Sequence, residues 1–303
     1  MGWISPPSCE QLWRSYRQGA VPSPSGPAAR CSLKGSNLDI QQLSSALARP
    51  NHLTPTSFWH GHIPFAHYLV ASLRPRRIVE FGVEHGDSLF AFADAARWNG
   101  IQAEIIGCDL WSGDQHVGRQ DEWIFQRVSQ IAQTYGGSVA LRRMRTTDLA
   151  KELEDDSVDL LHIDASHSYE DAAADFDSMR SKLSQRAIVL FHDITIYTER
   201  YGVWRLWQDL SKNFDHLLFT HSCGLGVLAF GSSLPQPFAD LVRSTEDEKL
   251  ALARLFSNLG RRVTLEFDAV AQREAVMRMN SFSQPAALQP SSLLTRCLDL
   301  ARW

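Results

Sequence analysis

The sequence has no long hydrophobic run and no signal-peptide core. None of its apolar stretches reaches the roughly 18 residues that a membrane-spanning helix needs. Pro6, Pro7 and Glu10 also interrupt the first residues. We therefore expect no membrane span and a cytoplasmic location.

Cysteine is sparse and irregularly placed. The five cysteines are odd in number and show no C-x-x-C spacing, which argues against a zinc site and against a disulfide framework. A reducing compartment suits such a chain. The positions are Cys9, Cys31, Cys108, Cys223 and Cys297.

Positive charge is not in excess. The formal net charge is -4 at pH 7 and the pI is near 6.3, so the chain lacks the basic field that nucleic-acid binding requires. Arg142, Arg143 and Arg145 form one local basic group, which we interpret as a solvated strand end. We expect no nucleic-acid partner.

A glycine-containing turn follows the first predicted strand, which is the position at which a phosphate-binding motif would be expected. Residues 78–81 favour a buried strand, and the pattern Glu80-x-Gly82-x-x-x-Gly86 closes it. This turn lacks the Gly-x-Gly-x-x-Gly spacing of a dinucleotide site, and no Gly-Lys-Ser/Thr follows it. Phosphate binding is therefore not the first interpretation.

The residues after this turn favour the start of a helix. The two glycines permit a tight turn, and Asp87 or Ser88 can cap the helix. Backbone N–H groups at such a turn are available to a ligand. An acidic residue inside the turn suits a ligand with an amino acid group and a ribose. The alternative is an ordinary strand-to-helix turn.

From residue 76 onward, short apolar runs alternate with helical stretches, which is typical of β-α-β units. The last two runs are joined by a link too short for a parallel crossover, so we expect an antiparallel hairpin there. The prediction is an α/β, Rossmann-like fold with a mostly parallel seven-stranded sheet, a final antiparallel hairpin and helices on both faces. Strands are predicted at 77–82, 103–109, 138–143, 158–164, 187–192, 215–220 and 226–231, and helices at 87–98, 120–134, 147–153, 169–183 and 203–212.

The two ends of the chain differ in character from this central region. Prolines divide the first residues, and charged amphipathic stretches follow the last predicted strand. The predicted divisions are an N-terminal arm at 1–56 with helices at 10–18 and 38–48, the main domain at 57–232, and a helical extension at 233–303 with helices at 238–258 and 265–279.

An aromatic and histidine-rich segment at 57–70 precedes the first strand. It holds three histidines and four aromatic residues. It could form a lid over the glycine turn, but we favour the alternative, in which it packs as a helix on the sheet.

In open α/β sheets, ligands collect at the carboxyl ends of the strands. Asp109 ends a predicted strand and is placed to accept hydrogen bonds from ribose hydroxyls, and Leu110 follows it. The next loop contains Trp111, Asp114 and His116. We expect it to fold over the cofactor or the acceptor.

Two further strands bring chemistry-bearing residues to the same edge. Asp164 ends one strand and His167 follows, while His192 and Asp193 end the next. Two carboxylates and two imidazoles can hold a divalent cation, and a histidine can act as a base near neutral pH. The alternative is that the aspartates cap the following helices and the histidines are satisfied by hydrogen bonds.

Together these blocks resemble the class I S-adenosylmethionine-dependent methyltransferases. The chain looks closest to a bacterial group found beside, or fused to, glycosyltransferases, and is distantly similar to metal-dependent sugar O-methyltransferases. The resemblance covers roughly residues 57–231. Its blocks are the glycine turn at 80–86, CDLWSGDQH at 108–116, HIDASHSY at 162–169 and LFHD at 190–193, with weaker ones at 61–66, 202–207 and 224–228.

The resemblance implies the class I methyltransferase fold and transfer of a methyl group to a hydroxyl of a sugar, a glycan or a related small natural product. It implies His167 and Asp164 as catalytic residues, with His167 as the base. Cofactor binding would fall to Glu80, Gly82, Gly86, Ser88, Asp109, Leu110 and Asp164.

The distant family also implies Mg²⁺ or Mn²⁺ at Asp164, His192 and Asp193. That family has an acidic pair where this chain has His192 and Asp193. Because imidazole suits Mg²⁺ poorly, either the ion is Mn²⁺-like or His192 points elsewhere. The implied partners are a small-molecule or glycan acceptor, and a second copy of the chain or a glycosyltransferase.

Two other functions stay open on the sequence. A non-catalytic scaffold could keep the cofactor-binding fold to organise a glycan-assembly complex. A metal-dependent hydroxylase on the same fold would need a redox metal held by the same aspartates and histidines.

Overall fold

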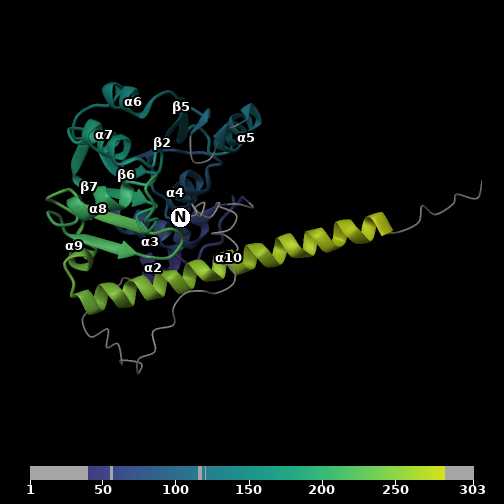
Figure 1. Ribbon diagram of the computed structural model, residues 1–303. Coiled ribbons are helices and arrows are strands. Elements are labelled where there is room, and N and C mark those ends of the chain that lie inside the picture. Colours follow the sequence, from purple (N-terminus) through teal and green to yellow (C-terminus); the bar gives the residue numbers. More distant parts are fainter. Residues whose placement is uncertain (1–39, 55–56, 115–117, 120, 284–303) are drawn as a thin grey trace, which may run out of the picture. The chain divides into compact units, whose positions relative to one another are not determined.

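The computed structural model describes residues 40–54, 57–114, 118–119 and 121–283 (Figure 1). The strands are β1 (Arg77–Phe81), β2 (Glu104–Asp109), β3 (Gly113–Asp114), β4 (Gly118–Arg119), β5 (Val139–Arg143), β6 (Val158–Ile163), β7 (Leu183–His192), β8 (His216–Phe219) and β9 (Leu225–Ala229). The helices are α2 (Ile40–Ser45), the 3-10 helix η1 (Phe58–His62), α3 (Ile63–Leu73), α4 (Asp87–Trp98), α5 (Glu122–Gln133), α6 (Thr146–Glu152), α7 (Tyr169–Met179), α8 (Val203–Leu210), α9 (Gln236–Val242) and α10 (Glu246–Ser283).

The main sheet has seven strands in the order β5-β2-β1-β6-β7-β9-β8. The pairs among β5, β2, β1, β6 and β7 are parallel, whereas β9 runs antiparallel to both of its neighbours, β7 and β8. The predicted fold class, including the terminal antiparallel hairpin, is therefore confirmed. β3 and β4 form a separate two-stranded hairpin that the sequence did not suggest.

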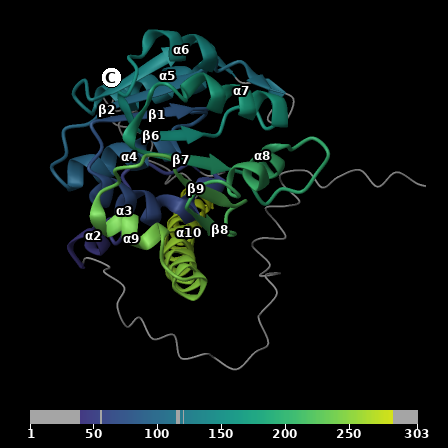
Figure 2. The same cartoon turned by 90° about the vertical axis from the view of Figure 1, so that its left-hand side faces the viewer.

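Side chains of the central strands alternate between two apolar layers. Ile78 and Leu160 lie in one layer with α3 and α4, and Val79 and Leu161 lie in the other with α6, α7 and α8. Figure 2 shows these two groups of helices on opposite sides of the sheet. Strands covered on both faces must be apolar on both, which explains the near-continuous apolar runs of β1, β6 and β7.

One predicted helix boundary is wrong. The helix predicted at 169–183 ends at Met179, and β7 begins at Leu183, four residues earlier than expected. Leu183 is buried and pairs with Val158 across an irregularity in the ladder. Apolar periodicity alone cannot separate a helix end from a strand start at such a place.

The prediction of two charged C-terminal helices at 238–258 and 265–279 is also wrong. The structure has the short α9 and then the 38-residue α10. Thr245 and Glu248 form a capping box, with the Thr245 N–H donating to Glu248 at 3.0 Å and the Glu248 N–H donating to the Thr245 hydroxyl at 3.4 Å. This box starts α10 inside the first predicted helix.

The chain divides into two compact units, Met1–Val263 and Thr264–Trp303, and the boundary falls inside α10. The predicted divisions at 56/57 and 232/233 stay predictions. The helix predicted at 10–18, His116 and the tail from residue 284 lie outside the described residues. In the described part of the chain, no helix combines the length and apolar character needed to cross a bilayer.

The α3 helix is buried along its whole length, so this part of the histidine-rich segment packs on the sheet as expected. Burial lowers the pKa of its His67 to about 4, against a weaker opposing effect of Asp94. The unfolded chain, in which this pKa is near 6.5, therefore takes up a proton that the folded chain refuses. Stability should fall as the pH drops from about 6.5 towards 4.

We expect His67 to contribute on the order of 2 to 3 kcal/mol to this loss between pH 7 and 4.5. Urea unfolding of the wild type and of His67→Leu at both pH values measures it. The variant should lose less stability on acidification. Equal losses in the two proteins would contradict the assignment.

Candidate active site at the carboxyl edge of the sheet

A cavity of about 730 Å³ lies at the carboxyl ends of the central strands. It brings together the two groups of residues that the sequence singled out. The predicted cofactor residues that line it are Gly82, Gly86, Ser88, Asp109, Leu110 and Asp164, and the predicted catalytic and metal residues that line it are Asp164, His167, His192 and Asp193. Glu80 does not line it.

Gly82 joins the end of β1 to the turn in a conformation that only glycine adopts readily. Its φ is +84°, and a Cβ atom there would lie 2.0 Å from the backbone oxygen of Asp164. The ends of β1 and β6 can therefore approach each other only because residue 82 has no side chain. The close approach leaves the cavity open above the turn.

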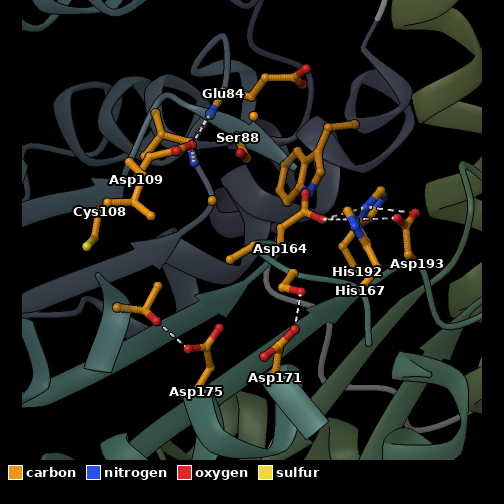
Figure 3. Close-up of a pocket in the computed structure, with 18 of the residues that line it drawn as sticks. Glu84, Ser88, Cys108, Asp109, Asp164, His167, Asp171, Asp175, His192 and Asp193 are labelled. Carbon is orange, nitrogen blue, oxygen red and sulfur yellow. Dashed lines mark hydrogen bonds and ion pairs between the residues drawn. The ribbon is translucent and has the colours of Figure 1, made fainter. Parts of the chain in front are cut away.

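Asp109 braces this turn from the neighbouring strand. Its carboxylate accepts hydrogen bonds from the backbone N–H groups of Val83 and Glu84, both at 2.9 Å, and of Trp111 at 2.7 Å (Figure 3). Asp109, the predicted ribose acceptor, is thus held in place by the turn that is predicted to bind the rest of the cofactor.

Glu80 lies fully buried behind Ser88, whose hydroxyl donates a hydrogen bond to it. Burial raises the pKa of Glu80 well above its ordinary value. Nδ1 of His162 lies 3.3 Å from the same carboxylate oxygen, and within the described residues the other oxygen has no hydrogen-bond partner. The position of Glu80 allows a supporting role behind the cavity wall.

His162 links Glu80 to the histidine-rich segment. The indole N–H of Trp59, which lines the cavity, donates to Nε2 of His162 at 3.2 Å. Burial lowers the pKa of His162 to about 4, so the ring is neutral and carries its proton on Nδ1, facing Glu80. The sequence could have suggested the contact between Glu80 and His162 only through strand register, because these two residues are partners in the β1–β6 pair.

The prediction that Asp87 or Ser88 caps the following helix is wrong. The N-cap of α4 is Gly86, with no side-chain cap. Asp87 instead accepts hydrogen bonds from the N–H and hydroxyl of Thr54, at 2.8 and 2.6 Å, and lies 3.0 Å from Nε2 of His60. Burial alone would raise the pKa of Asp87, but these partners outweigh it and lower the pKa.

This Asp87 contact holds the histidine-rich segment against α4. As a consequence, Ser57, Phe58 and Trp59 form one wall of the cavity. The segment therefore both packs in the core, through α3, and borders the site.

Asp164, His167, His192 and Asp193 point toward one another at the other end of the cavity (Figure 3). Nε2 of His167 lies 3.0 Å from Asp193 and 3.9 Å from Asp164. Neither aspartate caps a helix, because the N-caps of α7 and α8 are Ser168 and Gly202. The capping alternative for these aspartates is therefore wrong.

His192 lies between the two aspartates. Its Nδ1 is 3.3 Å from Asp164 and 3.2 Å from Asp193, and its Nε2 donates to the backbone oxygen of Ser222 at 3.0 Å. Burial lowers the pKa of His192, but the two carboxylates outweigh burial and raise it to about 9. The Ser222 carbonyl thus occupies Nε2 of His192, while Nδ1 faces both carboxylates.

The backbone around this cluster is strained in two places. Asp193 has a φ of +62°, and in the β8–β9 turn Ser222 and Cys223 have φ values of +51° and +64°. Left-handed conformations at residues other than glycine cost energy and cluster at functional sites. The turn reaches the site because β9, running antiparallel to β7, starts at the carboxyl edge of the sheet. The sequence analysis predicted this hairpin but did not connect its turn with the site.

Residues 79–194 match a family model described as a methyltransferase domain. The match runs from within β1 to just past His192 and Asp193. It therefore contains both groups of predicted site residues that line the cavity, but not the wall formed by residues 57–59. Residues 79–194 are thus similar to a methyltransferase domain.

A relative of this chain occurs in Sinorhizobium fredii. Its uncharacterized protein y4gI is 39% identical over 213 residues, which cover 70% of this chain. The aligned region is 23% of that protein, so the chain spans about a quarter of the length of its relative.

Solved methyltransferases have a similar architecture. The S-adenosylhomocysteine-bound PaMTH1 of Podospora anserina is 17% identical with a TM-score of 0.45, over 75% of this chain and 98% of that one. TomG of Streptomyces achromogenes, solved with S-adenosylmethionine, is 17% identical with a TM-score of 0.42, over 63% of this chain and 90% of that one. The fold assignment of this chain rests on its own strand order.

Proposed function

We propose that this protein is an S-adenosylmethionine-dependent O-methyltransferase that acts on a hydroxyl of a sugar, a glycan or a related small natural product. One observation carries the proposal: a glycine-turn cradle and the cluster of Asp164, His167 and Asp193 share a single cavity. The first suits the cofactor, and the second suits activation of a hydroxyl.

The residues present fit this cofactor. Gly82 lets the glycine turn pass close to the backbone after β6, and Asp109 is oriented at the end of β2 as a ribose acceptor would be. Ser88 lines the cavity, and its hydroxyl donates to one oxygen of the buried Glu80, whose other oxygen has no hydrogen-bond partner among the described residues. When bound, S-adenosylmethionine would supply the methyl group from its sulfonium sulfur.

In this proposal, His167 removes the proton of the acceptor hydroxyl as the oxygen takes up the methyl group. The negative charge of Asp193, 3.0 Å from Nε2, stabilises the imidazolium that forms. Asp164, 3.9 Å from the same nitrogen, adds to this negative charge. General base catalysis of this kind contributes about 10²- to 10⁴-fold.

The same donors also fit a divalent cation. One ligand atom from each of Asp164, His167 and Asp193 lies within 4.8 Å of the others. We therefore replace His192 with His167 in the ligand set inferred from the sequence. An imidazole ligand favours Mn²⁺ over Mg²⁺. His167 would then be a ligand rather than the base, and the ion would lower the pKa of the acceptor hydroxyl.

Calorimetry of the full chain with S-adenosylhomocysteine, with and without Mn²⁺, tests this function. We expect saturable binding to the wild type, and transfer of a labelled methyl group to glycoside acceptors that weakens after chelation of metal. Absence of binding would contradict the proposal and favour the scaffold. Iron-dependent oxygen consumption would favour the hydroxylase.

We extend the proposal to a cytoplasmic enzyme that works as a homo-oligomer or beside a glycosyltransferase. Among the described residues, Cys108 forms no disulfide, which suits a reducing compartment. The match to a quarter of a longer relative supports a domain that works beside others. Light scattering of the full chain measures the oligomeric state, and a monomer would contradict the first alternative.

A further inference from the structure

Gly61 lies in η1, between two elements that are far from it in the sequence. A Cβ atom at Gly61 would lie 2.0 Å from the hydroxyl oxygen of Ser222, and a Cβ atom at Gly260 of α10 would lie 2.0 Å from the backbone oxygen of Gly61. We call these three residues the glycine stack. It brings α10, η1 and the β8–β9 turn into direct contact.

The glycine stack adjoins a carbonyl group that two histidines share. Nε2 of His62 and Nε2 of His192 both donate to the backbone oxygen of Ser222, at 3.1 and 3.0 Å. His221, next to Ser222, lies with its Nε2 3.0 Å from the backbone oxygen of Gly61. The turn is therefore attached to η1 at His221 and at the Ser222 carbonyl that holds His192.

The turn cannot hold this position by its own conformational preference. Ser222 and Cys223 both have left-handed φ values, which cost roughly 1 to 2 kcal/mol per residue. The surrounding contacts must supply that energy. Contacts that end on the turn come from η1 and from the end of β7 and the residues after it, where the Thr195 N–H donates to the backbone oxygen of Cys223 at 3.1 Å. Gly260 of α10 in turn meets η1 at Gly61.

The first part of α10 is fixed in the core. Phe256 is fully buried and its ring lies 5.2 Å from Phe65 and 6.1 Å from Phe219, while Val263 is also buried. Gly260 lies between these two anchors. Because α10 cannot move away from η1 without exposing Phe256, the close approach at Gly260 is rigid.

We propose that the glycine stack positions His192 between Asp164 and Asp193, and that α10 is in this way part of the catalytic machinery. The expected effect on catalysis rests on the proposed function, whereas the contacts of the glycine stack do not depend on it. His192 is here a positioning residue: it spaces the two carboxylates, and the carbonyl of Ser222 sets its ring orientation.

A methyl group at Gly61 tests the stack most directly. Gly61→Ala forces the methyl against the Ser222 hydroxyl, and Ser222→Gly removes that hydroxyl while keeping the carbonyl and the left-handed φ. The double variant should therefore recover most of what the single variant loses. Asn258→Ala, an exposed position two residues before Gly260, is the matched control in α10.

The structural readout is the ring N–H signals of His62 and His192 in ¹⁵N NMR of the full chain. We expect two slowly exchanging Nε2–H signals in the wild type and in Asn258→Ala. Both should shift or broaden in Gly61→Ala and return in the double variant. If Gly61→Ala does not fold, Gly260→Ala serves in its place, because its methyl group meets the Gly61 oxygen.

The catalytic readout is methyl transfer by the same variants. We expect Gly61→Ala to be slower by about 10- to 100-fold, as misplacement of a catalytic constellation by a fraction of an ångström would cause, with recovery in the double variant. Unchanged histidine signals in a folded Gly61→Ala protein would overturn the inference. A wild type that binds no S-adenosylhomocysteine but shows the expected NMR pattern would overturn only the proposed function.

Discussion

Alanine in place of His167 is expected to slow methyl transfer by about 10²- to 10⁴-fold. The side chain lines the cavity, and its Nε2 lies 3.0 Å from Asp193 and 3.9 Å from Asp164. The affinity for S-adenosylhomocysteine should change by less than about threefold, because the cradle residues do not depend on His167. Steady-state rates and calorimetry on the same samples measure the two effects.

A second variant separates the two roles of this histidine. His167→Gln keeps an oxygen donor for a cation but cannot take up a proton at neutral pH. If His167 is the base, the glutamine variant should be as slow as the alanine variant. If it is a metal ligand, added Mn²⁺ should restore part of the rate. His216→Ala, at a histidine outside the cavity, is the control, and wild-type rates in His167→Ala would remove His167 from the mechanism.

Gly82→Ala is expected to abolish detectable binding of S-adenosylhomocysteine. The new methyl group would meet the backbone oxygen of Asp164, which belongs to the neighbouring strand and cannot turn away. The strand ends must separate, and that displacement moves both the cradle and Asp164. We expect a loss of stability of about 2 to 5 kcal/mol, from the left-handed φ and the clash together.

Gly100→Ala provides the matched control for this prediction. Gly100 also has a positive φ, of +59°, but a Cβ atom there would meet nothing within 4 Å. It should cost only about 1 to 2 kcal/mol and leave cofactor binding intact. Chemical unfolding and calorimetry compare the two variants. Equal behaviour would show that the contact at Gly82 does not matter.

The sheet and the main site residues could be predicted from the sequence for a simple reason. Each parallel strand is a short apolar run with a clear end, and the residue at that end must lie at the carboxyl edge. Asp109, Asp164 and Asp193 were found in this way, and the short link before β9 predicted the antiparallel hairpin.

The supporting contacts could not be predicted because they depend on register and on distant packing. Glu80 faces His162 only because β1 and β6 pair in one particular register. Gly61 and Gly260 meet across 199 residues, by subtraction of their numbers, and no spacing in the sequence links the two glycines. The start of α10 could have been predicted from the capping-box spacing of Thr245 and Glu248. The amphipathic periodicity instead favoured a helix that begins at residue 238.

The central claim is that a cofactor cradle and an aspartate–histidine cluster act in one cavity. A crystal structure with S-adenosylhomocysteine and Mn²⁺, with anomalous data for the metal, tests it most directly. We predict the ribose at Asp109, the amino acid part near Gly82 and Ser88, and a manganese peak between Asp164, His167 and Asp193. S-adenosylhomocysteine bound elsewhere, or a cavity that stays empty at saturating ligand, would contradict the account.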